Sequence, residues 1–352
     1  MDVGHPAPVR PGGEAGGAVG GAVGGEVIAR CRRLFDPALR EAVSVLHPWG
    51  AKMAAFTLGW SDIDGGSHDH GGGKGLRPAI ALLSAEAAGG GAESALPVAV
   101  AVELVHAFSL VHDDIIDNDE RRRHREALWK AYGVGPALLT GDALLALAVR
   151  QLADRPEAMG YLSTALVELV QGQTADMAFE QRPWDGPDQV STAEYVEMVT
   201  AKTGGLLGAA AAAGVATGGA PELADRMWEM GRHLGVAFQI VDDMLGIWGD
   251  PGITGKPVHS DLRRDKKTYP VLAALGSQGT AARELSALLV SGTADDATVR
   301  HAARLAEEAG GREAAQMLAE RHLSAAVHLM DMCLPGAVDL RALCDSLVNR
   351  VS

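Results

Sequence analysis

The chain has 352 residues, of which 47% are hydrophobic, so it can bury a large core in one big domain or two smaller ones. A formal net charge of -14 at pH 7 argues against nucleic acid as a partner, because a phosphate backbone demands a basic face. The sequence has no charge-free apolar run of about 18 residues and no signal-peptide pattern, so we expect a cytoplasmic protein without a membrane span.

Residues 1–25 are rich in glycine, whose backbone loses much entropy on ordering, and they predict a flexible tail. Beyond them, apolar residues recur at helical spacing, as in the alanine-rich stretch 206–215, and alternating strand patterns are almost absent. Glycine- and proline-rich breaks indicate about ten to thirteen helices without an interdomain linker. We therefore predict a single all-α domain over residues 26–352.

A glycine-rich turn at residues 71–75 comes before Pro78, a residue that suits the first turn of a helix. Glycines let the backbone approach an anion, and Lys74 and Arg77 add an ammonium group and a guanidinium fork that can bind phosphate. The turn is therefore a candidate phosphate site. The alternative is an ordinary loop before a helix.

The next predicted helix is apolar but carries Asp113, Asp114 and Asp117, which we call the first aspartate motif. Ionised carboxylates are very costly to bury unless they are paired or bound to metal. Asp113 and Asp117 lie one helical turn apart and face the same way. Oxygen ligands at this spacing suit Mg²⁺. A solvated acidic face is the alternative.

A second apolar stretch carries Asp242 and Asp243, the second aspartate motif. Each motif is followed by a basic cluster, which alone would be a solvated surface. Beside an acidic metal site, such clusters indicate partners for a small polyphosphate. They comprise Arg121, Arg122, Arg123 and Arg125 after the first motif, and Arg263, Arg264, Lys266 and Lys267 after the second.

The cysteines are few, odd in number and without metal-ligand spacing: Cys31, Cys333 and Cys344. They are interpreted as reduced thiols, which agrees with a cytoplasmic location. The run His68-Asp69-His70 lies next to flexible glycines. We interpret it as a solvated loop, with a metal site as the alternative.

The motifs occur in an order that resembles the trans-isoprenyl diphosphate synthases of the polyprenyl synthetase family. They are Gly-Gly-Lys-x-x-Arg-Pro, a histidine before Asp-Asp-x-x-Asp, Arg-Arg, Lys-Thr-Gly, Phe-Gln-x-x-Asp-Asp, Gly-Lys and Lys-Lys-Thr. The resemblance runs from about Phe35 to Leu347. It implies an isoprenoid-synthase-type bundle of helices around a central cavity. It also implies a homodimer, for which a hydrophobic helix pair near residues 96–150 could supply the interface.

The resemblance assigns roles to individual residues. The diphosphate of isopentenyl diphosphate would be held by Lys74, Arg77, His106 and Arg123. The allylic diphosphate would be contacted by Arg122, Lys202, Thr203, Gln239, Lys256 and Lys266. Roughly three Mg²⁺ ions at most would be held by Asp113, Asp114, Asp117, Asp242 and Asp243. The residues expected to be catalytic are Asp113, Asp117, Arg122, Lys202 and Asp242.

The expected reaction ionises an allylic diphosphate with the help of Mg²⁺ and cationic side chains. Attack by isopentenyl diphosphate and loss of a proton then lengthen the chain head to tail. Phe108 and Ser109, just before the first motif, are the expected determinants of product length. An aromatic residue at the position of Phe108 resembles the short-chain group, so geranylgeranyl diphosphate is favoured over farnesyl diphosphate. Plain core packing is the alternative for Phe108, as it is for His106.

The sequence departs from the family pattern at two places. Gly246 stands where the third aspartate of the second motif is usual, so we expect weakened metal binding. Asp250 could restore the charge only if the helix continues past Gly249. Glu126 and Ala127 replace the usual Pro-Thr after the arginines, and Glu126 could reduce their pull on phosphate.

Two rival functions remain open. The spacing of Asp242, Gly246 and Asp250 loosely resembles the metal motif of class I terpene cyclases. A cyclase has no second diphosphate to hold, however, and would not need the cationic set assigned to isopentenyl diphosphate. A non-catalytic subunit that modulates another synthase is the third possibility, and the intact first motif argues against it.

Overall fold

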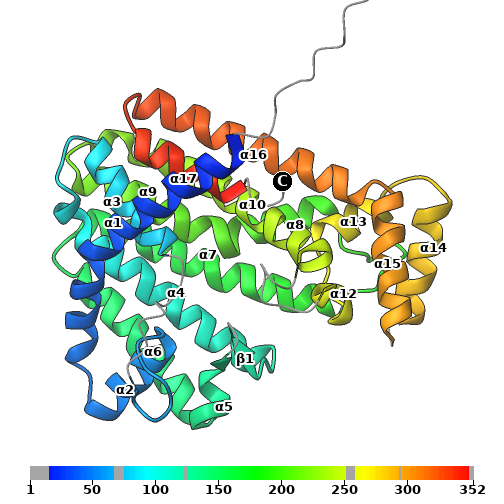
Figure 1. The fold of residues 1–352 in the computed structure, drawn as a ribbon, viewed down its shortest axis with the longest axis horizontal. Coiled ribbons are helices and arrows are strands. Elements are labelled where there is room, and N and C mark those ends of the chain that lie inside the picture. Colours follow the sequence, from blue (N-terminus) through cyan, green and yellow to red (C-terminus); the bar gives the residue numbers. More distant parts are fainter. Residues whose placement is uncertain (1–15, 67–74, 123–124, 251–257, 293–294, 349–352) are drawn as a thin grey trace, which may run out of the picture.

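The computed structural model describes residues 16–66, 75–122, 125–250, 258–292 and 295–348 (Figure 1). Its α-helices are α1 (Gly16–Ser44), α2 (Pro48–Thr57), α3 (Leu76–Ala87), α4 (Leu96–Ile116), α5 (Leu128–Tyr132), α6 (Val134–Gln151), α7 (Pro156–Glu180), α8 (Thr192–Val199), α9 (Gly205–Thr217), α10 (Ala224–Trp248), α12 (Ser260–Arg263), α13 (Tyr269–Leu275), α14 (Thr280–Ser291), α15 (Asp296–Glu308), α16 (Gly311–Cys333) and α17 (Val338–Val348). Short 3₁₀ segments lie at Ala92–Ala95 and Pro221–Leu223, and a π-helical segment, η2, joins α8 to α9 at Thr200–Gly204.

The predicted all-α class is confirmed, since the only strands in the described residues form one small hairpin. It pairs β1 (Arg121–Arg122) with β2 (Arg125–Glu126) in antiparallel register. The described residues contain more α-helices than the ten to thirteen expected. Helices as short as α5 and α12 span too few residues to show an apolar period in the sequence.

Helices α9 and α10 form the part of the core that positions the candidate site. Every residue from Gly205 to Val215 in α9 is buried, and small residues dominate this run. A Cβ on Gly235 of α10 would lie 2.4 Å from the Cα of Gly204, so the two backbones are in contact there. This close packing fixes α10, which carries the second aspartate motif, against η2, which carries Lys202.

The N-terminal prediction needs a correction at its boundary. Helix α1 begins at Gly16, inside the range 1–25 that was predicted to be a flexible tail. A Cβ on Gly24 would lie 2.6 Å from the Cβ of Ser346, so α1 approaches α17 closely. Contact with another helix offsets the entropy that a glycine-rich segment loses on ordering. Residues 1–15 lie outside the described part of the chain.

Two helical stretches are long and apolar enough to cross a membrane, Ala92–Ile116 and Thr192–Thr217. Within the fold, 61% of the first apolar window and 83% of the second are buried. Core helices of soluble proteins commonly have this composition, so these stretches are weak evidence for a span. The expected absence of a membrane span stays a prediction.

The three cysteines are buried and unbridged, as expected for reduced core thiols. Burial raises the pKa of Cys31 to about 11 and that of Cys344 to about 12. Both thiols therefore stay protonated at neutral pH and are poor nucleophiles. The run His68-Asp69-His70 lies outside the described residues.

Candidate active site

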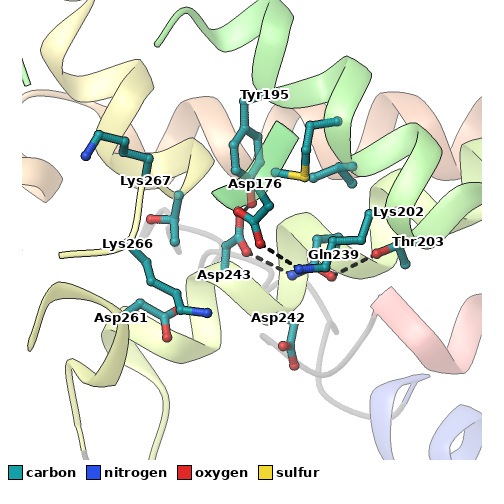
Figure 2. A pocket seen from close by; sticks show the side chains of 13 residues that line it. Asp176, Tyr195, Lys202, Thr203, Gln239, Asp242, Asp243, Asp261, Lys266 and Lys267 are labelled. Atoms are coloured by element: carbon teal, nitrogen blue, oxygen red, sulfur yellow. Dashed lines mark hydrogen bonds and ion pairs between the residues drawn. The ribbon is translucent and has the colours of Figure 1, made fainter. Parts of the chain in front are cut away.

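A pocket of about 150 Å³ opens where α7, α8, η2, α10 and the segment around α12 meet (Figure 2). Carboxylates and amines dominate its polar lining. It is lined by Asp176, Tyr195, Met198, Val199, Lys202, Thr203, Gln239, Asp242, Asp243, Asp261, Lys266, Lys267 and Thr268. Among these are most of the residues that the sequence assigned to the allylic diphosphate and to the second aspartate motif.

The π-helical segment η2 presents Lys202 and Thr203 to this pocket. Single π-helical turns often occur at functional sites. The Lys202 ammonium donates a hydrogen bond to the Asp176 carboxylate at 2.6 Å, and the Thr203 hydroxyl donates to the side-chain oxygen of Gln239 at 3.2 Å. An anionic substrate would therefore compete with Asp176 for the Lys202 ammonium.

The two aspartates of the second motif differ in environment. Asp243 is 3% exposed and accepts hydrogen bonds from the Tyr195 hydroxyl at 2.5 Å, from the Gln239 amide at 3.1 Å and from the Tyr269 backbone N–H at 3.3 Å. Asp242 is exposed, lines the pocket and points away from Asp243 (Figure 2). Asp243 therefore anchors the helix and its neighbours, and Asp242 is the carboxylate presented to a ligand.

Burial raises the pKa of Asp243 to about 7, although its hydrogen bonds act in the opposite direction. The negative charge of Asp261 adds to the rise. The same kind of environment surrounds Asp113 of the first motif. Its pKa is raised to about 6, chiefly by burial and partly by Asp117, whereas Lys202 lowers it. Added positive charge would therefore stabilise the ionised form of both carboxyl groups.

The first aspartate motif lies at the C-terminal end of α4 and reaches the pocket through Lys266. The Lys266 ammonium donates to the Asp117 carboxylate at 3.2 Å, and Lys266 itself lines the pocket. The positive charge of Lys202 also acts on Asp113 and lowers its pKa. The predicted convergence of the first motif, Lys202 and Lys266 on one region is thus present in the fold.

Asp114 has a different partner from the rest of its motif. Its carboxylate is 4% exposed in the fold and accepts hydrogen bonds from Arg122, at 2.7 Å from Nε and 2.6 Å from the terminal guanidinium nitrogen. Both nitrogens contact the same carboxylate oxygen, Oδ1, and this ion pair fastens the β-hairpin to α4. Arg122, expected to contact the allylic diphosphate, is therefore engaged by a protein carboxylate here.

The basic clusters divide between structural and pocket positions. Arg125 donates to the Ser61 carbonyl, and its guanidinium lies 4.6 Å from the ring centre of Phe56. Arg263 pairs with Asp296, and Arg264 pairs with Asp119. Lys267 packs with its ammonium 4.1 Å from the ring centre of Trp184. Of the second cluster, Lys266 and Lys267 line the pocket.

Glu126, at the departure from the family pattern, is exposed. In the backbone register of the hairpin it lies opposite Arg121.

Three of the predicted substrate residues, Lys74, Arg123 and Lys256, lie outside the described residues. Arg77 lies in the first turn of α3, which also contains Pro78 as predicted. Gly75 precedes that helix with φ 66°, a left-handed conformation that glycine adopts without strain. His106 is half-buried on α4, two turns before Asp113.

The expected length determinants lie further back on α4. The Phe108 ring packs edge-on against His112 with centroids 4.8 Å apart, and a ring nitrogen of His112 lies 3.4 Å from the Leu138 carbonyl of α6. The Ser109 hydroxyl donates to the His106 carbonyl at 2.9 Å. Phe108 therefore lies on the side of α4 that carries a contact to α6.

The donor set of the two motifs fits Mg²⁺. Among the described residues, no three aspartate, glutamate, histidine or cysteine side chains gather closely enough to bind a metal by themselves. Asp113, Asp117 and Asp242 supply carboxylate oxygens, the donor type that Mg²⁺ prefers, and Mg²⁺ usually completes its shell with water and substrate phosphate. A site shared between protein and diphosphate agrees with this arrangement.

Three of the pocket residues were not predicted from the sequence, because no motif singled them out. Asp176 on α7, Tyr195 on α8 and Asp261 on α12 all line the pocket. Asp176 and Asp261 gain their place only from tertiary packing.

Comparison with known proteins gives a consistent result. A family model described as polyprenyl synthetase matches residues 68–306. A (2E,6E)-farnesyl diphosphate synthase of Mycobacterium tuberculosis is 43% identical over 337 residues, which cover 92% of either chain. A geranylgeranyl diphosphate synthase of the same organism is 40% identical over 335 residues, covering 92% of this chain and 93% of the relative.

Solved structures agree with this fold. The structure of a geranylgeranyl pyrophosphate synthase from Corynebacterium glutamicum, complexed with calcium and isoprenyl diphosphate, superposes with a TM-score of 0.76 at 28% identity. The match covers 98% of this chain and 100% of that one. The likeness thus extends over nearly the whole length of both chains.

Proposed function

Because the chain belongs to the polyprenyl synthetase family, we propose that it is a prenyltransferase that joins isopentenyl diphosphate to an allylic diphosphate. The observation that carries the proposal is that Lys202, Lys266 and the aspartates of the second motif line one pocket, and that Lys266 also binds Asp117 of the first motif. Such a mixture of cations and carboxylates suits a diphosphate that arrives with divalent metal.

The two pocket lysines are the groups that would receive the allylic diphosphate. Each is held by an acid, Lys202 by Asp176 and Lys266 by Asp117. A diphosphate carries more negative charge than either carboxylate and would take over these amines. Arg122, fixed by Asp114, adds a positive charge near the first motif. The basic groups thereby stabilise the negative charge that develops as the allylic carbon–oxygen bond breaks.

The metal-binding carboxylates in this proposal are Asp113, Asp117 and Asp242. Asp114 and Asp243 were also expected to bind Mg²⁺, but both are buried and accept hydrogen bonds from protein donors, so we assign them to positioning the other three. Bound Mg²⁺, in roughly three ions at most, would neutralise the leaving diphosphate. Once the allylic carbon–oxygen bond has broken and diphosphate has left, the double bond of isopentenyl diphosphate attacks the allylic carbon. A carbon–carbon bond forms, a proton leaves the former isopentenyl unit, and the product is longer by one five-carbon unit.

The second diphosphate distinguishes this function from its rivals. Arg77 and His106, with Lys74 and Arg123, are assigned to isopentenyl diphosphate, which a terpene cyclase does not bind. Helix α10 ends at Trp248, and Gly249 is extended, so Asp250 is not on the helix that carries Asp242. The residues with the cyclase-like spacing therefore do not all lie on one continuous helix.

We propose a short-chain all-trans product, with geranylgeranyl diphosphate favoured over farnesyl diphosphate. The two Mycobacterium relatives carry both names at similar identity, so the choice depends on Phe108 and Ser109 of α4. Phe108 is packed against the hydrophobic core at this level of the helix. Its ring limits the room for a growing tail if the tail lies along α4.

A homodimer is also part of the proposal. Helix α6 exposes large apolar side chains that a monomer would leave in water, and α7 exposes others. They include Val134, Leu138, Leu139 and Val149 on α6, and Val167, Val170 and Met177 on α7. Nucleic acid is no partner in this proposal, and the protein is cytoplasmic without a membrane span.

The test is a product analysis with purified protein, Mg²⁺ and isopentenyl diphosphate, supplied with dimethylallyl, geranyl or farnesyl diphosphate in turn. Chain-extended diphosphates are expected, and Asp113→Ala should abolish them. Cyclic hydrocarbons formed without isopentenyl diphosphate would instead identify a cyclase. A folded protein that turns over none of these substrates would identify a non-catalytic subunit.

A further inference from the structure

The indole ring of Trp184 contacts both chain neighbours of the pocket residue Lys266. Its N–H donates a hydrogen bond to the Asp265 carboxylate at 3.0 Å. The ammonium of Lys267 lies 4.1 Å from the centre of the same indole ring system. Lys266 stands between these two contacts, so one side chain from the connection between α7 and α8 holds the chain on either side of Lys266.

Both contacts lie in a sheltered part of the fold. Trp184 and Lys267 are 6% and 7% exposed. Burial lowers the pKa of the Lys267 ammonium, although Asp265 and Glu180 act in the opposite direction. The attraction between an ammonium group and an indole face is strongest where water is excluded. The contact with Trp184 therefore fixes Lys267 more firmly than the same contact would at the surface.

The backbone at Asp265 gains from such a hold. Asp265 has φ 56°, a left-handed conformation that a residue other than glycine adopts at a cost. The next two side chains, Lys266 and Lys267, point to opposite sides (Figure 2). With the Lys267 ammonium held by Trp184, the Lys266 ammonium is directed toward the Asp117 carboxylate, 3.2 Å away.

The chain segment that carries Trp184 is itself fastened by Arg182. The Arg182 guanidinium donates to the Asp188 and Gln189 carbonyls at 2.7 Å and 2.8 Å. It also donates to the Glu194 carboxylate at 2.7 Å, and Glu194 belongs to the capping box at the start of α8. Trp184 is thus anchored independently of the segment that it holds.

We propose that Trp184 is a positioning residue for the allylic diphosphate site: it holds Asp265 and Lys267 so that Lys266 stays in place when it exchanges Asp117 for a diphosphate. The inference rests on the proposed function, because Lys266 is a binding group only if a diphosphate enters the pocket. A side chain that only fills the core would need neither an indole N–H at Asp265 nor a ring face under an ammonium group.

The first experiment measures binding of inorganic diphosphate with Mg²⁺ to the full chain by isothermal titration calorimetry. Trp184→Leu removes both contacts and keeps an apolar side chain in the core. It should weaken binding by about 10-fold, because a small displacement of a positioned group can cost up to about 100-fold. Trp184→Phe keeps a ring for Lys267 and loses only the N–H, so its affinity should lie between the other two. Trp49→Leu is the matched control at an exposed tryptophan and should bind as the parent does.

Asp265→Gly separates positioning from stability. Glycine adopts the φ of this position without strain, so the melting temperature should stay close to the parental value. The carboxylate that accepts from Trp184 is lost, however, and diphosphate binding should weaken by about threefold or more. Parental affinity in Asp265→Gly and in a folded Trp184→Leu protein would overturn the proposal. If Trp184→Leu does not fold, Asp265→Gly decides by itself.

A second experiment asks whether Trp184 acts through Lys266. In Lys266→Gln protein, the further change Trp184→Leu should alter diphosphate affinity by less than about twofold, because residues that act through one group are not additive. In kinetics, Trp184→Leu should raise KM for the allylic substrate and leave KM for isopentenyl diphosphate within about twofold of the parent. A full additional loss in the double variant, or equal rises in both KM values, would indicate general packing and overturn the proposal.

Failure of this inference can be told apart from failure of the proposed function. Parent protein that extends allylic diphosphates, with diphosphate affinity unchanged in Trp184→Leu and Asp265→Gly, refutes the role of Trp184 alone. Parent protein whose diphosphate binding depends on Trp184 and Lys266, but which forms no extended product, refutes the prenyltransferase proposal and leaves the positioning role in place.

Discussion

The Lys266 ammonium lies 3.2 Å from the Asp117 carboxylate and so ties the end of α4 to the chain that follows α12. The two side chains are 29% and 20% exposed, so the pair is shielded from water on most sides. Burial lowers the pKa of Lys266, but neighbouring carboxylates, first among them Asp117, raise it above its ordinary value overall. Lys266 is therefore charged at neutral pH and ready to exchange one anion for another.

We expect Lys266→Gln to lower kcat for chain elongation by about 100-fold, the usual cost of removing a group that stabilises developing negative charge. The loss of a charge that binds the diphosphate before and during bond breaking should also raise KM for the allylic substrate. Steady-state kinetics with geranyl diphosphate as the varied substrate measure both effects.

Arg263→Gln is the matched control, because Arg263 lies in the same segment but pairs with the exposed Asp296 at the surface. It should change kcat by less than about twofold, in line with the small contribution of surface ion pairs. Equal losses in both variants would show that the segment as a whole, and not the Lys266 charge, matters.

A second prediction concerns Tyr195, whose hydroxyl donates to the buried Asp243. Tyr195→Phe leaves that carboxyl group, which is 3% exposed, with fewer hydrogen bonds. The free energy of unfolding should fall by about 1–3 kcal/mol, the cost of leaving a buried polar group short of a hydrogen bond. Urea denaturation followed by circular dichroism measures the loss.

Tyr132→Phe serves as its comparison, since the Tyr132 hydroxyl makes only a long hydrogen bond of 3.4 Å to the Ile63 carbonyl. Its free energy of unfolding should stay within about 0.5 kcal/mol of the parent. If Tyr195→Phe is equally mild, Asp243 is held by Gln239 and the Tyr269 backbone without help from the hydroxyl.

Helical periodicity alone was enough to place Asp113 and Asp117 on one face of a buried helix, and the resemblance placed Lys202 and Gln239 beside the second motif. These residues depend on local geometry or on a short spacing. A Cβ on Gly246 would collide with the carboxylate of Asp261. This contact could not be predicted in the same way, because it depends on how α12 packs on α10.

The same contrast explains the other differences. Arg122 and Arg125 are neighbours in a basic cluster of the sequence, yet one binds Asp114 and the other packs on Phe56. The two residues lie directly opposite each other in the hairpin, but their long side chains reach different partners. A charge run in the sequence therefore does not tell which of its members reach a ligand. The start of α1 at Gly16 likewise depends on a helix more than three hundred residues away in the chain.

A third prediction tests the length determinants. Phe108→Ala should lengthen the main product by about one five-carbon unit, because removing the ring opens space along α4. Ser109→Phe should shorten it, since the new ring takes up space one turn below Asp113. Chromatography of the dephosphorylated products measures both shifts. Unchanged product length in both variants would place the growing tail elsewhere than along this face of α4.

The last prediction is a pH dependence that arises far from the pocket. His233 of α10 and His322 of α16 face each other with their Nδ1 atoms 2.9 Å apart. One ring must donate an N–H and the other accept it, so the pair cannot hold two full charges at this distance. Burial, with the neighbouring His233 and Arg321, lowers the pKa of His322 to about 4, and burial also lowers that of His233.

A histidine whose pKa is lowered by folding binds its proton more readily in the unfolded chain. The stability it contributes is fully present above the unfolded pKa of about 6.5 and is lost as the pH falls from there toward about 4. The rings are only partly buried, so we expect a loss on the order of 1 kcal/mol between pH 7 and pH 5.

The raised pKa values of Asp113 and Asp243 have the opposite sign, because their folded forms bind protons more readily than the unfolded chain does. The test therefore compares urea unfolding of the parent with that of His322→Gln at pH 7 and pH 5. The variant keeps these aspartates but lacks the histidine proton site, so its stability should fall less than that of the parent over this range. An identical fall in both proteins would show that the two rings do not resist protonation in the folded state.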